Sequence, residues 1–119
     1  PAFYSRRSGL RVDARADSPA DVARMVAARD ALDLHAAVLV CAPCPELDEL
    51  PFEEAETAIA QAVAEAEVAS IGGKALTPFL LARLVELTGG QSQRANEALL
   101  RHNASVAAHI ARMLAGSSR

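Results

Sequence analysis

The stretch GKALTPFLLARLVELTGG, residues 73–90, predicts a complete helix with its own start and stop signals. Thr77 directly precedes Pro78, and this pair favours a helix that begins there with Thr77 as its cap. The helical spacing of the large apolar residues predicts one packed face, made of Phe79, Leu80, Leu81, Leu84 and Leu87. The glycine pair at 89–90 then predicts the end of the helix.

Upstream of this stretch, Ser18 opens another predicted helix. Its hydroxyl can accept a hydrogen bond from a free backbone N–H, and Pro19 suits the first helical position. Asp21 places a negative charge at the positive end of the helix dipole. Apolar residues continue at helical spacing, so we expect a helix over residues 19–33.

Two more helices are predicted beside the opening stretch. Residues 52–69 carry acids near their start and an apolar stripe at helical spacing. After the glycine pair, Ser92 is the expected cap of a last helix over residues 93–115, whose apolar stripe includes Leu99 and Val106.

Two short strands are also expected. Residues 36–41, AAVLVC, form an apolar run that is typical of a buried, parallel strand, because helices are predicted on both sides of it. Residues 10–16 alternate between apolar and charged side chains, which indicates a weaker, half-exposed strand. Prolines then predict a loop, at Pro43, Pro45 and Pro51.

These elements predict an α/β fold that is rich in helix, with about four helices and one or two strands. A single buried strand cannot satisfy its own edges, so its sheet partners must come from elsewhere. The opening Pro1-Ala2-Phe3-Tyr4 also resembles the middle of a chain more than its start. We therefore expect residues 1–119 to be a single or partial domain, the C-terminal part of a larger protein.

The composition narrows the class of protein. The chain has 119 residues, is 51% hydrophobic and 3% aromatic and has no Trp, which predicts an aliphatic core rich in alanine. A net charge of −3 gives no electrostatic reason to expect nucleic acid or an anionic membrane as a partner. No window reaches the ~18 apolar residues that a membrane span requires. A soluble cytoplasmic protein is expected.

Cys41-Ala42-Pro43-Cys44 is a C-x-x-C motif after a predicted strand. One interpretation is a redox pair of the thioredoxin kind, in which a helix N-terminus lowers the pKa of the first thiol. Pro45 opposes it, because no long helix can start at the second cysteine. A zinc site requires two further ligands at suitable spacing. The other interpretation is two small apolar residues in a loop.

The last predicted helix carries two pairs of polar residues, each seven residues apart. Asn96 and Asn103 lie on nearly one face, either as amides satisfied within a core or as a polar patch that contacts a ligand. His102 and His109 make a poor metal site without a carboxylate between them, and we interpret them as packing or surface residues.

Basic residues provide two weaker candidates for phosphate binding. Lys74 follows two glycines at a helix start, which can hold a phosphate, but the full P-loop pattern is missing. Arg6 and Arg7 can line a phosphate pocket or be surface residues. No complete set of catalytic residues emerges from the residue pattern alone.

Ordered motifs along nearly the whole chain resemble those of the pseudouridine-5′-phosphate glycosidase family, whose members are similar to indigoidine synthase A. The 73–90 stretch carries the closest resemblance. The other matching motifs are Pro1–Arg6, Asp17-Ser18, Val22-Ala23, Pro43 with Pro45-Glu46, Ala58-Ile59, Gln61–Glu67, and Asn96, Leu99 and Asn103.

The resemblance implies an α/β/α sandwich enzyme. Such an enzyme reversibly cleaves the C–C bond of pseudouridine 5′-phosphate to uracil and ribose 5-phosphate. It implies a Schiff-base lysine, a glutamate and an aspartate that holds Mn²⁺, all in the family's N-terminal part and absent from this chain. Lys74 does not match that lysine. The residue carried over is Asn96, for binding substrate, and the resemblance also implies a homo-oligomer, a trimer.

The chain departs from the family pattern at several positions. Ala36-Ala37 replaces a glycine pair, Ala42 an asparagine, Cys44 an aliphatic residue and His102 an asparagine. These departures motivate an alternative, a diverged helical module for assembly without catalytic activity. A thiol–disulfide protein that uses Cys41 and Cys44 is a third hypothesis.

Overall fold

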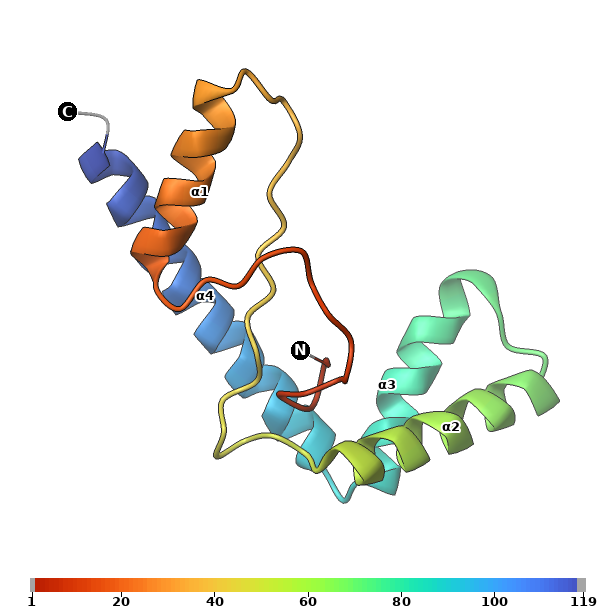
Figure 1. Cartoon of the computed structure of the whole chain (residues 1–119). Coiled ribbons are helices and arrows are strands. Elements are labelled where there is room, and N and C mark those ends of the chain that lie inside the picture. Colours follow the sequence, from red (N-terminus) through yellow and green to blue (C-terminus); the bar gives the residue numbers. More distant parts are fainter. Residues whose placement is uncertain (1, 118–119) are drawn as a thin grey trace.

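The computed structural model describes residues 2–117, which form four α-helices and one short 3₁₀ helix (Figure 1). In chain order the elements are α1 (Pro19–Ala31), α2 (Phe52–Val68), the 3₁₀ helix η1 (Gly73–Ala75), α3 (Leu76–Leu87) and α4 (Gln91–Ser117). α1 packs along α4 and α2 packs along α3, so the molecule has two arms. The arms meet where α3 turns into α4.

The start of α1 confirms the predicted cap. The Asp21 N–H donates to Ser18 Oγ at 3.2 Å, and Ser18 Oγ donates to the Asp21 carboxylate at 2.7 Å. This bond from Ser18 is the main reason why the pKa of Asp21 lies below its ordinary value. The helix ends at Ala31, two residues before the predicted end. Asp33 has a φ of 55°, outside the right-handed helical region.

The junction between the arms depends on Thr88. Its hydroxyl donates to the Leu84 carbonyl at 2.6 Å and accepts from the Ser92 N–H at 3.0 Å, so one side chain closes α3 and caps α4. Gly89 and Gly90 follow with φ of 55° and 82°, which favour glycine. The predicted glycine stop is confirmed. The predicted Ser92 cap is wrong, because Ser92 lies within the first turn of α4 and is buried.

The predicted Thr77 cap is also wrong. η1 leads directly into α3, which begins at Leu76, and Thr77 is already helical. The cap residue is Ala75, and it makes no side-chain hydrogen bond to the helix. The preceding 3₁₀ turn is continuous with the helix, since the Leu76 N–H donates to the Gly73 carbonyl.

The two predicted strands are wrong within residues 2–117. Residues 10–16 and 36–41 have no strand assignment, and no backbone–backbone hydrogen bond involves either segment. The expected burial is absent too, since Leu39 is 87% exposed. Their composition favours an extended chain, but a strand also requires a neighbouring strand to pair with.

A set of hydrogen bonds fastens the start of the chain to the loop before α2. The Leu50 N–H donates to the Tyr4 carbonyl at 2.9 Å, and Ser5 Oγ donates to the Leu50 carbonyl at 2.7 Å. Both backbone groups of Leu50 are therefore satisfied where its side chain is 2% exposed. We call this contact of residues 4–6 with residues 44–50 the clasp.

Arg6 extends the clasp toward the solvent. Its backbone N–H donates to the Glu49 carboxylate and its guanidinium donates to the Cys44 carbonyl, each at 2.8 Å. The clasp thus joins segments about forty positions apart in sequence, as the 38- and 43-residue separations of these bonds show.

The core lies where the clasp meets the helices. The prediction of an alanine-rich aliphatic core is confirmed, since the buried cluster consists of Tyr4, Cys44, Leu50, Ala55, Ala58, Ala62, Leu84 and Ala95. Small side chains allow the helices to approach closely, but each buries little apolar area. Leu50, which is 2% exposed, is the largest fully buried side chain in the described part of the chain, and it belongs to this cluster.

An ion pair joins α2 to α3. Arg83 Nε lies 2.5 Å from Glu65 Oε2, and the Arg83 guanidinium also contacts Glu86 at 2.6 Å. The hydrogen bond from Arg83 is the largest cause of a lowered pKa at Glu65, and a bond from Gln61 adds to it. The bonds to Glu65 and Glu86 raise the pKa of Arg83.

The molecule is less compact than a typical domain of this length. Its Cα radius of gyration is 17.6 Å, against about 13.5 Å expected for 119 residues. Its accessible surface is 8676 Å², against about 6200 Å² expected for 12.5 kDa. Much of the surface that a compact domain buries is therefore open here.

Leu50→Ala should lower the free energy of unfolding by about 2–5 kcal/mol, because it leaves a cavity in a small core. Leu47→Ala is the matched control, since Leu47 lies in the same loop and is 99% exposed. Its effect should stay within about 0.5 kcal/mol. Urea unfolding followed by circular dichroism measures both, and equal effects would contradict the central position of Leu50.

The Glu65–Arg83 pair should make stability depend on pH. Because the pKa of Glu65 in the folded state lies below its ordinary value of 4.5, the contribution is complete above that value. It is lost as the pH falls through the lower folded-state pKa. Glu65→Gln should therefore unfold at lower urea than the unmodified chain at pH 7, and the difference should shrink as the pH falls below 4.5. Glu67→Gln, an exposed neighbour on α2, should show no such difference at any pH in this range.

Candidate functional site

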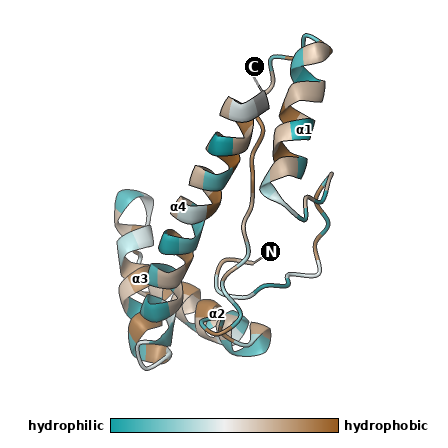
Figure 2. Cartoon of the chain, turned by 90° about the vertical axis from the view of Figure 1, so that its left-hand side faces the viewer, coloured by the Kyte–Doolittle hydropathy of each residue, from teal (hydrophilic) through white to brown (hydrophobic). Residues whose placement is uncertain are grey.

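An open groove of about 830 Å³ lies in the arm formed by α1 and α4. Four parts of the chain line it: residues 11–14 with 16–19, α1, residues 37–43 and α4. Figure 2 shows the extended segment before α2 as a largely apolar trace in view between α1 and α4. The helices contribute Val22, Met25, His102, Val106 and Ile110. The lining is mostly apolar and contains no set of convergent acid, base and nucleophile.

Asn96 lies on α4 between two buried residues, Ala95 and Leu99, and is itself half-buried. It is not among the residues that line this groove. No side-chain hydrogen bond to the Asn96 amide forms within residues 2–117, so its donors and acceptor are available to a ligand. Asn103 lies two turns further along and is exposed, so the two amides differ in environment.

Ser92 is a polar residue whose importance the sequence reasoning missed. It is 2% exposed, and its hydroxyl has no hydrogen-bond partner within the described part of the chain. It precedes Asn96 by four residues, one turn of α4, so both lie on the same side of the helix. This four-residue spacing is visible in the sequence, but the sequence analysis interpreted Ser92 only as a helix cap.

The two cysteines lie in different environments. Cys41 is exposed and lines the groove, whereas Cys44 is fully buried, with its thiol 3.8 Å from the Ala95 carbonyl. Burial raises the pKa of the Cys44 thiol, and the charges of Asp48 and Glu49 raise it further. A redox pair requires at least one thiol of lowered pKa beside an accessible partner. The environment of Cys44 is typical of a core residue.

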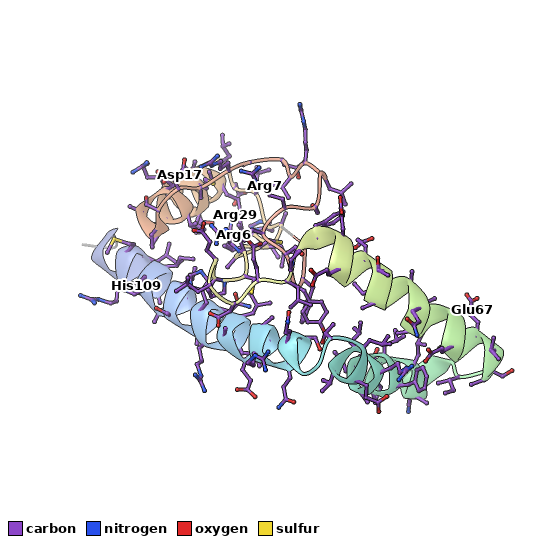
Figure 3. The ribbon with its side chains drawn as sticks, turned by 90° about the horizontal axis from the view of Figure 1, so that it is seen from below. Arg6, Arg7, Asp17, Arg29, Glu67 and His109 are labelled. Carbon is purple, nitrogen blue, oxygen red and sulfur yellow. The ribbon has the colours of Figure 1, made fainter. Side chains whose placement is uncertain are left out.

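The basic candidates do not gather into one site. Figure 3 shows Arg6 and Arg7 in the N-terminal segment, well away from Glu67 at the far end of α2. Arg6 is occupied by the clasp, and Arg7 is exposed. Lys74 is exposed in η1, in the arm opposite the groove.

The histidines are also separated. His102 is half-buried and lines the groove, whereas His109 is exposed, with Nδ1 2.7 Å from the Ser105 carbonyl oxygen. No group of three or more His, Cys, Asp or Glu side chains that suits a metal ion occurs in residues 2–117. The resemblance places the Mn²⁺ site in the family's N-terminal part, outside this chain. None of the helices within residues 2–117 combines the length and the apolar composition that a membrane span requires.

The sequence profile of the family described as "Indigoidine synthase A like protein" matches residues 1–113. The chain belongs to this family. It is 50% identical over 117 residues to a pseudouridine-5′-phosphate glycosidase of Methylobacterium nodulans, covering 98% of this chain and 35% of that protein. Glycosidases of the same name from Rhodospirillum centenum and Kosmotoga olearia are 53% and 45% identical, covering 93% and 100% of this chain.

A solved structure has the same fold. The crystal structure of the prealnumycin C-glycosynthase AlnA in complex with ribulose 5-phosphate matches with a TM-score of 0.84 and 30% identity. The match covers 98% of this chain and 38% of that one. This indigoidine-synthase-A-like chain thus spans 35–41% of the length of the relatives named above.

Iodoacetamide should alkylate Cys41 in the native chain at least about tenfold faster than Cys44, because only Cys41 is exposed and the thiolate is the reactive form. Peptide mass spectrometry measures both rates, and urea should make them similar. Rapid formation of a Cys41–Cys44 disulfide under mild oxidation would contradict this difference and would favour the thiol–disulfide hypothesis.

Proposed function

We propose that this chain is the C-terminal portion of a pseudouridine-5′-phosphate glycosidase. Such an enzyme reversibly cleaves the C–C glycosidic bond of pseudouridine 5′-phosphate to uracil and ribose 5-phosphate. The observation that carries the proposal is the 45–53% identity to three glycosidases over 93–100% of this chain. The ribulose 5-phosphate in the C-glycosynthase structure supports it, because that ligand is a five-carbon sugar phosphate like the proposed product.

In this proposal the chain contributes a wall of the substrate pocket, and the catalytic groups belong to the rest of the enzyme. Opening the sugar and cleaving a C–C bond requires a covalent electron sink, which a lysine iminium supplies. The one lysine here, Lys74, lies in the arm opposite the groove. The proposal also includes a homotrimer that works in the cytoplasm with Mn²⁺ held outside this chain.

Asn96 is the residue proposed to bind substrate. Its amide offers two donors and one acceptor, and no described side chain occupies them. Half-burial on α4 holds the side chain in a partly dry environment. A substrate that hydrogen-bonds to the amide there binds more tightly than one that leaves the amide unpaired. The buried hydroxyl of Ser92, one turn earlier, is an available partner that can orient the amide.

One observation favours the alternative of a diverged assembly module. Three positions that depart from the family pattern line the same groove: Ala37, Ala42 and His102. Side chains that replace glycine or asparagine there change the shape and polarity of that surface. A chain that had lost its substrate while keeping its fold would show such changes together.

A chimera tests the proposal. This chain replaces its counterpart in the Methylobacterium nodulans relative, and the product is assayed for pseudouridine 5′-phosphate formed from uracil and ribose 5-phosphate with Mn²⁺. We expect activity within about tenfold of the parent, and none from the isolated 119-residue chain. A folded but inactive chimera would support the assembly module, above all if Ala37→Gly, Ala42→Asn and His102→Asn restored activity. Turnover by the isolated chain would contradict the proposal that the catalytic groups belong to the rest of the enzyme.

Asn96→Ala in the active chimera should raise KM for pseudouridine 5′-phosphate about tenfold, the effect of losing ~1.4 kcal/mol of binding. Gln93→Ala is the control, since Gln93 lies in the same part of α4 but is exposed and pairs with Glu97. Steady-state kinetics measures both variants. An unchanged KM for Asn96→Ala would remove this residue from the pocket.

A further inference from the structure

The hydroxyl of Ser92 is enclosed by the protein but makes no hydrogen bond there. Ser92 is 2% exposed, and its Oγ has no partner among the described residues. A hydroxyl that leaves water without gaining a partner raises the free energy of the folded chain. Buried polar groups in folded proteins are almost always paired, so this exception indicates a role that outweighs its cost.

The enclosure of Ser92 Oγ limits which group can pair with it. Solvent, a substrate or another chain cannot contact an atom that this chain already covers. A partner must therefore come from this chain. Ala95, one turn further along α4, belongs to the buried cluster, whose other members are alanines and leucines apart from Tyr4 and Cys44. The core beside Ser92 thus offers few polar side chains.

The polar groups one turn before Ser92 are already in use. Thr88 Oγ1 donates to the Leu84 carbonyl and accepts from the Ser92 N–H. The Thr88 carbonyl accepts the Gln91 N–H at 3.1 Å. One turn after Ser92 lies Asn96, whose amide has no side-chain partner within residues 2–117. The Asn96 amide is therefore the free group that can satisfy this hydroxyl.

Helix geometry places these two side chains next to each other. Residues four apart on an α-helix differ by about 40° around its axis, and their Cβ atoms lie about 5–6 Å apart. A hydroxyl and an amide span that distance with one hydrogen bond when both adopt suitable χ angles. Asn96 is half-buried, at the edge of the buried face that Ala95 and Leu99 mark. One end of its amide can face Ser92 while the other end faces outward.

We propose that Ser92 is a positioning residue. When a substrate binds one end of the Asn96 amide, the Ser92 hydroxyl hydrogen-bonds to the other end. This inference rests on the substrate-binding role proposed for Asn96. A substrate that fixes one end of the amide selects the orientation in which the other end meets Ser92. The pairing removes the cost of an unpaired buried hydroxyl, so the substrate gains affinity from an atom that it does not contact.

Ser92→Ala separates this role from a structural one. Removing an unpaired hydroxyl does not destabilise the fold, so the urea midpoint of the 119-residue chain should stay the same or rise. In the active chimera the same change should raise KM for pseudouridine 5′-phosphate about fivefold, with kcat within about twofold of the parent. A serine that only supported the fold would instead lower the urea midpoint.

Ser105→Ala is the matched control on the same helix. Ser105 is exposed, and its Oγ lies 3.5 Å from His109 Nδ1, away from Asn96. The same steady-state kinetics and urea unfolding measure this variant. Both KM and the urea midpoint should match those of the parent.

A double-mutant cycle assigns the effect to Asn96. Ser92→Ala should raise KM no further when residue 96 is already changed by Asn96→Ala, because the hydroxyl acts only through that amide. If the two changes raise KM independently, Ser92 does not act through Asn96 and the proposal is wrong.

Two further results would overturn the role of Ser92. One is an unchanged KM for Ser92→Ala in a chimera where Asn96→Ala raises KM, which would leave the proposed function standing. The other is a clearly lower urea midpoint for Ser92→Ala, which would make the hydroxyl a structural group. An inactive chimera would contradict the proposed function itself, and this inference would fail with it.

Discussion

The clasp between residues 4–6 and residues 44–50 is the contact on which the rest of this structure depends. Both backbone groups of Leu50 are bonded in the core, one to Tyr4 and the other to Ser5, so its burial leaves no backbone group unsatisfied. Its side chain belongs to the buried cluster that also contains alanines of α2 and α4 and Leu84 of α3. The clasp thus links the junction of the two arms to residues 4–6, which belong to no helix.

The alanine-rich core explains why the clasp matters so much. Alanine lets α2, α3 and α4 approach closely, but each buried methyl contributes little hydrophobic free energy. Few large side chains are buried, so polar contacts such as the Glu65–Arg83 pair and the Thr88 hydroxyl have a larger share in fixing the helices. The groove beside α1 and α4 is also open, and no other described part of the chain covers its apolar lining.

Local signals predicted most of the helical fold. Ser18 acts through its hydroxyl on the nearby Asp21 N–H, and the glycines at 89–90 act through their own backbone, and the structure agrees with both. The errors arose where an element depends on a residue or strand distant in the sequence. Thr88 reaches across a turn to cap α4 in place of Ser92, and residues 36–41 lack the neighbour that makes an extended chain a strand. For the site, resemblance singled out Asn96, but the buried hydroxyl of Ser92 emerged only from the packing.

The exposed run Val38-Leu39-Val40 affects the solubility of the polypeptide while this run is not covered. It combines β-branched residues, no charge and an unpaired backbone, which are the features of segments that nucleate aggregation. Only His35 and Asp33 before it and Pro43 after it act as gatekeepers against edge-to-edge association. Val38, Leu39 and Val40 should therefore favour association between copies of the free chain through this segment.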